Sequence, residues 1–115
     1  MKVHPIVKGT FSEINIEFTD SLKSQAKVIV GYDSISKKLI GYWLTSLGAG
    51  SSIPHGTGDV YTNSFELTFP YFNEPHWRDV FIYHPESNTW TFKMESNIDS
   101  TNWKTFGDYK LLKMK

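Results

Sequence analysis

Hydrophobic and polar residues alternate along most of this chain. In FSEINIEF (11–18), apolar side chains recur at almost every second position, with Glu or Asn residues between them. A period of two is typical of a β-strand with one face in a core and the other in solvent. FELTF (65–69) and TWTFKMES (89–96) show the same pattern. The predicted strands are 11–18, 25–32, 39–46, 56–61, 65–69, 76–84, 89–96 and 103–114.

The number and spacing of these runs predict the fold class. About eight short strands at roughly ten-residue spacing, separated by turn-forming residues, are typical of an antiparallel sandwich, meander or barrel. We predict an all-β protein whose antiparallel up-and-down meander forms a barrel or half-barrel. A helix is indicated only near residues 20–25 and is too short to change this picture. No linker or low-complexity segment divides the chain, so residues 1–115 are expected to form one domain.

The longest predicted connection is SLGAGSSIPHG (46–56), which is rich in glycine and serine. It does not match a P-loop, because Thr57 and Gly58 follow Gly56 where Lys and Ser or Thr are needed. It also lacks the spacing of a dinucleotide-binding fingerprint and of a nucleophile elbow. We therefore expect a loop at an open end of the barrel, which either covers a pocket as a lid or only links two strands. The candidate lid residues are Gly48, Gly50 and His55.

Charge and composition argue against several classes of function. Twelve Lys and Arg residues balance twelve Asp and Glu residues, so the net charge is zero and we expect no nucleic-acid partner. There is no cysteine, which excludes disulfides, a thiolate nucleophile and a Cys-based zinc site. No stretch is apolar enough for a membrane helix. We expect a soluble cytoplasmic protein with no membrane partner.

The titratable residues form no recognisable catalytic or metal-binding motif. The histidines are spread along the chain without a spacing such as H-E-x-x-H, and the carboxylates occur singly. We therefore expect no catalytic residue, no metal site and no cofactor. An enzyme with a carboxylate or histidine as general base is the weakest alternative, because the sequence shows no mutual geometry for it. The four histidines are His4, His55, His76 and His84.

Arg78 is the only arginine, and it lies inside the predicted strand HWRDVFIYH (76–84). It shares one face with Val80 and Ile82, whereas Asp79 lies on the other face among aromatic residues. One face of a barrel strand points inward, so either Arg78 or Asp79 is expected to be at least partly buried and to need a partner. An inward arginine would bind a ligand carboxylate. The alternative is an ion pair or a position at the rim.

Aromatic residues make up 16% of the chain, with four Trp, six Tyr and eight Phe. In a domain of this size most of them must fill the core, and the others are available to line a pocket. The candidate ligand-binding residues are Trp43, Arg78, Tyr83, Trp90 and Phe92.

Six short motifs follow one another between Gly9 and Lys110. They are GYD (31–33), YWLTSLGAG (42–50), GTGD (56–59), WRDV (77–80), TWTFKMES (89–96) and FGDYK (106–110). In order and spacing they resemble a bacterial lipocalin-like family of unknown function, the one numbered 1579 among domains of unknown function. The resemblance implies a lipocalin-like barrel or half-barrel and no particular activity.

Two features depart from the pattern of that family. Thr45 stands where an acidic residue is expected, which argues against a polar site on that strand. The N-terminal region also lacks an opening strand with the Gly-Trp element that such proteins often carry. An incompletely closed sheet has exposed edges, which favours a homodimer.

The sequence leaves two functions from different classes open. In the first, the inner face of the sheet binds a small apolar or amphipathic molecule, with Trp43 and Trp90 as walls and Arg78 as the anchor of an anionic group. In the second, the core is filled and the domain self-associates through a sheet edge or an aromatic surface. The choice depends on which face of each strand points inward, and a shift of one residue reverses every assignment.

Overall fold

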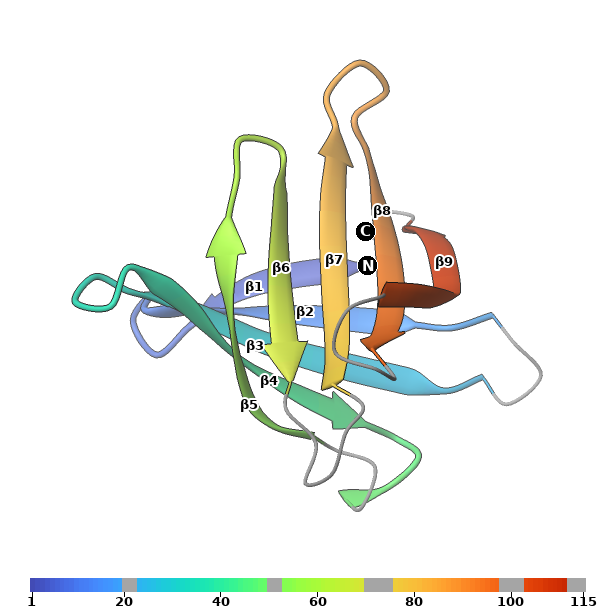
Figure 1. Ribbon diagram of the computed structural model, residues 1–115, viewed down its shortest axis with the longest axis horizontal. Helices are drawn as coiled ribbons and strands as arrows, with labels where there is room; N and C mark the ends of the chain where they lie inside the picture. The colour runs from blue at the N-terminus through green and yellow to red at the C-terminus, as the bar shows by residue number, and fades with distance from the viewer. Residues whose placement is uncertain (20–22, 50–52, 70–75, 98–102, 112–115) are drawn as a thin grey trace.

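The computed structural model describes residues 1–19, 23–49, 53–69, 76–97 and 103–111 (Figure 1). These residues form one sheet in which each strand pairs antiparallel with the next one in the chain. The predicted all-β up-and-down meander is therefore confirmed. The nine strands are β1 (Lys2–Ile6), β2 (Phe11–Glu17), β3 (Gln25–Asp33), β4 (Lys38–Thr45), β5 (Ile53–Val60), β6 (Ser64–Phe69), β7 (His76–His84), β8 (Thr89–Asn97) and β9 (Trp103–Leu111).

The sequence pattern does not predict β1. This strand pairs with β2 over its whole length, with Val3 opposite Ile14. It contains Pro5, which has no amide proton and is tolerated in sheets mainly on edge strands. Because the strand is short and interrupted by proline, its alternation is weak. An opening strand is therefore present, although it contains no Gly-Trp element.

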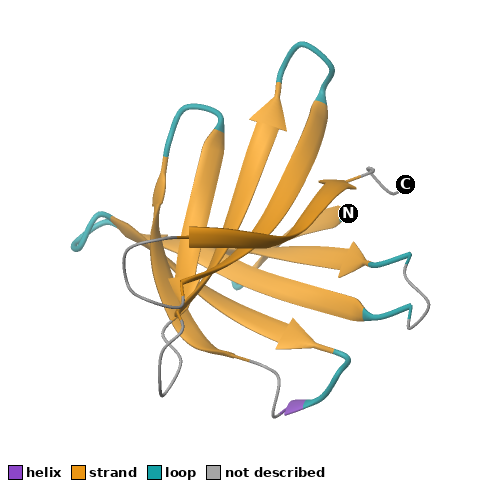
Figure 2. Ribbon diagram, turned by 45° about the vertical axis from the view of Figure 1, so that its right-hand side comes forward, coloured by secondary structure: helices purple, strands orange, loops and turns teal. Residues whose placement is uncertain are grey.

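The sheet curls but does not close. Within the described residues, β1 and β9 are the two edges and do not pair with each other. Figures 1 and 2 show that β1–β4 run across β6–β8 at a steep angle, so the two groups of strands form facing walls. Phe18, which follows β2, contacts Tyr109 of β9, with 5.2 Å between the ring centroids. The sheet is thus a half-barrel whose open side is narrowed by side chains.

The core lies between these two walls. On β2, buried Ile14 and Ile16 alternate with half-buried or exposed polar residues, as the sequence pattern predicts. Fully burying a large apolar side chain contributes roughly 1.5–3 kcal/mol, so the central residues dominate the stability of the sheet. The largest fully buried side chains are Val28, Leu67, Phe69, Phe81 and Phe92.

Glycines on β4 and β5 let the sheet bend between the walls. Gly41, Gly56 and Gly58 are buried, and Gly41 lies opposite Gly56 in the ladder. The register shifts between Gly41 and Trp43, and irregularities of this kind bend a strand. A Cβ atom on Gly58 would overlap the carbonyl oxygen of Glu66. Close approach of β5 to β6 therefore requires glycine at this position.

The glycine-rich stretch 46–56 is only partly a connection. Strand β5 begins at Ile53, so residues 53–56 belong to the strand and the predicted loop is too long at its C-terminal end.

Successive connections of a meander lie at alternate ends of the sheet. The β4–β5 connection is therefore at one end of the half-barrel, and the short turns are at the other end, at residues 7–10, 34–37, 61–63 and 85–88.

Candidate ligand pocket

An apolar pocket of about 180 Å³ lies between the two walls, toward the end of the half-barrel with the short turns. Val3, on the edge strand, is 52% exposed, whereas Phe81 is fully buried. The pocket therefore opens beside β1 and ends at the core. It is lined by Met1, Val3, Ser12, Ile14 and Val30 from the β1–β3 side and by Phe65, Phe81 and Trp90 from the β6–β8 side.

Three aromatic rings from adjacent strands form one wall of the pocket. Phe65 stacks on Phe81 with 4.7 Å between centroids and 12° between planes. Phe65 also meets the edge of Trp90, at 6.4 Å and 67°. Phe81 continues the stack into the core through Phe92, again at 4.7 Å. Phe81 is fully buried, Phe65 and Trp90 are half-buried, and the contacts between the three rings favour this arrangement, so we take the wall as preformed.

The predicted ligand-binding aromatic residues have three different locations. Trp90 lines the pocket. Phe92 is fully buried in the core and contacts Trp43, with 6.1 Å between ring centroids. Tyr83 packs on Trp90 at 5.2 Å, and its hydroxyl donates a hydrogen bond of 2.8 Å to Asn88 Oδ1 in the β7–β8 turn. Trp43 and Phe92 therefore belong to the core, and Tyr83 supports the pocket wall from the side of the turn.

Arg78 lies on the outer face of β7. Its Nε donates a hydrogen bond of 2.8 Å to Glu95 Oε1 on β8, and the two residues are direct partners in the ladder. Its guanidinium carbon lies 4.1 Å from the ring centroid of Trp103. Because Phe81 on the same strand points into the core, the period of two places Arg78 outside. Arg78 thus forms the ion pair that the sequence left as the alternative, and it does not reach the pocket.

Asp79 takes the inward position instead. It is 6% exposed, and its ladder partners are Leu67 on β6 and Met94 on β8. The Oδ2 atom has no hydrogen-bond partner in the described part of the chain. Burial disfavours the charged carboxylate and raises the pKa of Asp79 to about 8, so the carboxyl is mostly protonated at neutral pH. Asp79 precedes Phe81 by two positions and does not line the apolar pocket.

The predicted lid residues do not lie at this pocket. Gly48 lies in the β4–β5 connection and His55 near the start of β5, at the end of the half-barrel away from the short turns. His55 is exposed and contacts Tyr42 of β4, with 6.1 Å between ring centroids. Gly50 lies outside the described residues. His55 and Gly48 therefore do not cover the apolar pocket.

A wider hollow of about 470 Å³ lies across the ends of β2, β3 and β4. Its lining takes residues from both faces of the sheet, from buried Ile16 and Ala26 to exposed Glu17 and Leu44. Thr45, the residue that replaces the expected acid, also lines it. A hollow that wraps around strand ends is a surface depression and not an interior site. We therefore take the smaller apolar pocket as the candidate site.

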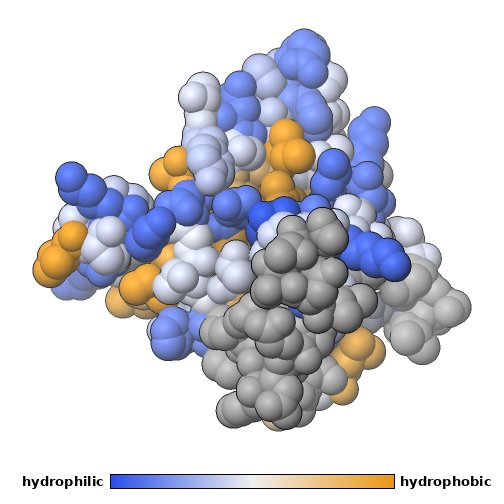
Figure 3. All heavy atoms as spheres, in the orientation of Figure 1, coloured by the Kyte–Doolittle hydropathy of each residue, from blue (hydrophilic) through white to orange (hydrophobic). Residues whose placement is uncertain are grey.

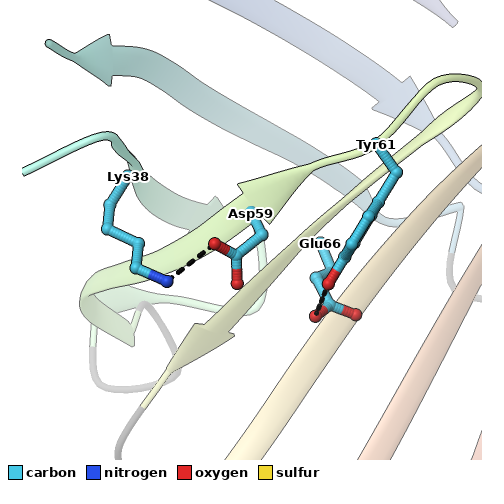
Figure 4. A network of polar contacts seen from close by, with 4 residues as sticks. All are labelled: Lys38, Asp59, Tyr61 and Glu66. Atoms are coloured by element: carbon cyan, nitrogen blue, oxygen red, sulfur yellow. Dashed lines mark hydrogen bonds and ion pairs between the residues drawn. The ribbon is translucent and has the colours of Figure 1, made fainter.

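Polar pairs cover the outer surface of β4–β6 (Figure 4). Lys38 Nζ donates a hydrogen bond of 2.7 Å to Asp59 Oδ1, and the Tyr61 hydroxyl donates one of 3.2 Å to Glu66 Oε1. The charge of Glu66 and this hydrogen bond raise the pKa of Tyr61. On the face shown in Figure 3, hydrophobic areas are separated by hydrophilic ones. These two polar pairs are typical of a surface that is exposed to solvent.

No family model matches the chain, and the searches of curated proteins and of solved structures return no match. In the part of the chain that the structure describes, no group of three or more His, Cys, Asp or Glu residues could hold a metal ion. No helix there is long and apolar enough to cross a membrane. Function is consequently inferred from the geometry of the pocket.

Sequence reasoning missed most of the pocket lining. Phe65 is an exception, because the alternation places it on the apolar face of a predicted strand, among the aromatic residues available to line a pocket. Val3 belongs to a strand that the pattern does not predict, and Ser12 is a polar residue at an inward position. No local signal indicates that these residues lie across the pocket from Phe65, because that depends on the curl of the whole sheet.

Proposed function

We propose that this protein binds a small apolar molecule, or the apolar end of a small amphiphile, in the pocket between the two walls. The observation that carries the proposal is the apolar lining of a partly enclosed pocket, in which Ser12 is the only polar residue among the eight. Moving apolar surface from water into such a site is favourable by roughly 25 cal/mol per Å². The stacked aromatic wall adds to affinity, because a preformed site loses little conformational entropy on binding.

The volume of the pocket sets the size of the ligand. At about 180 Å³, it resembles the apolar cavities of roughly 150 Å³ that bind benzene, and it is smaller than the roughly 300 Å³ at which sites for drug-sized ligands begin. A single aromatic ring or a short alkyl chain fits these dimensions. Haem and bile-salt-like amphiphiles are too large to enter as a whole.

The pocket lining supports binding without catalysis. None of its eight side chains is titratable, and the one titratable group on a lining residue is the α-amino group of Met1. A single amine without a carboxylate or histidine beside it in the described lining does not form an acid–base site. We therefore propose a non-enzymatic binding module. The resemblance to the lipocalin-like family numbered 1579 remains part of this proposal. It implies a half-barrel fold and no particular activity.

Binding of toluene, measured by NMR chemical-shift titration, tests the proposed function. We expect saturable shifts of the amides around the pocket in the native protein. Val3→Phe should fill the pocket from the exposed edge strand and weaken binding by at least about tenfold. Ile35→Phe is the matched control, because Ile35 is also exposed, lies in the β3–β4 turn and does not line the pocket. Absence of saturable shifts, or equal binding by the Val3→Phe variant, would overturn the proposal.

The open sheet supports a second candidate function, self-association. In the described part of the sheet, β1 and β9 each have a ladder partner on one side only. Unpaired edges present free backbone donors and acceptors to another strand. Sedimentation velocity over a hundredfold range of protein concentration tests this candidate. A concentration-dependent dimer would support it, and a constant monomeric sedimentation coefficient would exclude it.

A further inference from the structure

Among the described lining residues, Ser12 is the one with a hydroxyl, amide or charged side chain. It lies on β2 between Pro5 of β1 and Val30 of β3, and it is half-buried. Its hydroxyl has no hydrogen-bond partner among the residues that the structure describes. A serine hydroxyl can both donate and accept a hydrogen bond, so it is available to a polar group of a bound molecule.

The described lining offers an anionic ligand little positive charge. No lysine, arginine or histidine side chain is among the described lining residues, and their one basic group is the α-ammonium of Met1, whose pKa is lowered by burial. Arg78, the expected anchor, lies on the outer face and is paired with Glu95. Burying an unpaired carboxylate is strongly unfavourable. The desolvation that disfavours the charged Met1 ammonium also disfavours a ligand carboxylate, so the lining favours neutral ligands over fatty acids and other carboxylates.

The aromatic wall and Ser12 face each other across the pocket. The rings of Phe65, Phe81 and Trp90 come from one side, and Ser12 comes from the other. A flat ring packs favourably against an aromatic wall. A volume of about 180 Å³ leaves room for one ring with a small substituent.

We propose that the pocket selects small neutral phenols, with the ring against Phe65, Phe81 and Trp90 and the hydroxyl bonded to Ser12. This inference rests on the proposed function and specifies its ligand class. An aromatic hydrocarbon such as toluene makes the same ring contacts as a phenol, but it has no polar group that can bond to the Ser12 hydroxyl. A phenol gains one hydrogen bond at a partly desolvated site, which corresponds to about five- to tenfold tighter binding.

Three probes of similar shape test the proposal at pH 7: p-cresol, toluene and 4-methylbenzoate. A phenol with an ordinary pKa near 10 is neutral at this pH, whereas the benzoate is charged. The expected affinity order, from NMR titrations, is p-cresol, then toluene, then 4-methylbenzoate. If toluene binds and p-cresol binds no more tightly, the phenol inference is wrong and the proposed function stands. If neither toluene nor p-cresol binds, both are wrong.

Ser12 variants separate the hydrogen bond from the ring contacts. Ser12→Ala should reduce p-cresol affinity to that of toluene and leave toluene binding unchanged, whereas Ser12→Thr should keep the preference for p-cresol. Ser34→Ala, in the exposed β3–β4 turn, is the matched control and should bind like the native protein. A p-cresol preference that survives in Ser12→Ala would overturn the assignment of Ser12. Retained amide dispersion in the NMR spectrum of each variant shows that it is folded.

Discussion

Leu67 of β6 lies directly over Gly41 of β4, although β5 separates the two strands in the sheet. A Cβ atom on Gly41 would be 2.6 Å from Leu67 Cδ1. In a flat sheet, strands that are two positions apart are roughly 10 Å from each other. This contact therefore marks the corner at which the sheet folds over and brings the two walls face to face.

Substitution of Gly41 by alanine should destabilise this corner. The added methyl group would push against fully buried Leu67, and overpacking of this kind reduces the free energy of unfolding by about 1–3 kcal/mol. Leu67→Val should make room for the methyl group. We expect the double variant to lose less stability than the sum of the two single variants, as measured by urea denaturation. Additive effects would show that the two residues are not in contact.

Protonated Asp79 should make stability fall as pH rises. Its folded-state pKa is about 8, compared with 3.8 for an ordinary aspartate, so the unfolded chain loses this proton at a lower pH than the folded protein. The contribution is complete below about pH 4, declines steadily as the pH rises above that, and is lost beyond about pH 8. Urea denaturation between pH 5 and pH 8 covers most of this range.

The Asp79→Asn variant isolates this dependence, because an amide of the same shape does not titrate. The stability of the native protein relative to Asp79→Asn should decrease steadily from pH 5 to pH 8, while contributions from histidines cancel in the difference. Asp59→Asn on the outer surface is the matched control and should show no such trend. Parallel pH profiles of the native protein and Asp79→Asn would contradict a buried protonated acid at this position.

The Arg78–Glu95 pair should contribute to stability and not to ligand binding. Its hydrogen bond and the stacking of Arg78 on Trp103 together predict a loss of about 1–2 kcal/mol in Arg78→Ala. Lys38→Ala, which breaks the exposed pair with Asp59, should have a smaller effect that disappears in high salt. Toluene affinity should be the same in both variants. Weaker toluene binding in Arg78→Ala alone would show that the arginine acts on the pocket.

Phe81 should control the depth of the pocket. Phe81→Leu removes a ring from the stack between Phe65 and Phe92, so we expect a loss of about 1–3 kcal/mol in stability. The space that is freed should admit a larger ligand, and naphthalene should bind this variant more tightly than the native protein. Phe69→Leu is the matched control, since Phe69 is also fully buried and does not line the pocket. Equal naphthalene affinities in all three proteins would contradict this view of the pocket.

Much of the fold could be predicted from the sequence. Alternation along the chain identified eight of the nine strands, and turn-forming residues such as those at 33–38 and 85–88 separated them. These signals are local: side chains two positions apart share a face, and Asp, Asn, Ser, Gly and Pro favour turns. β1 was missed because Pro5 interrupts a strand of five residues. The predicted start of β5 lies too far along the chain, because glycines in this segment favour a loop in the sequence although they are buried in the structure.

The candidate site could be predicted only in part. Trp90 was among the expected ligand-binding residues and lines the pocket, whereas Arg78 belongs to the outer face. In HWRDVFIYH each face carries one charged residue among apolar ones, so the two orientations of β7 look alike in the sequence. The ladder decided between them, because it places Phe81 between Phe65 and Phe92.

The sequence by itself determined eight of the nine strands, their order along the chain and the pairs of residues that share a face. Only the tertiary structure decided which face of β7 is buried, that Leu67 reaches Gly41, and that Ser12 lies across a pocket from Trp90. The physical reason is that the two kinds of feature depend on interactions of different range along the chain. Strand periodicity depends on neighbours two residues apart, whereas the curl of the sheet depends on the combined packing of all nine strands around one core.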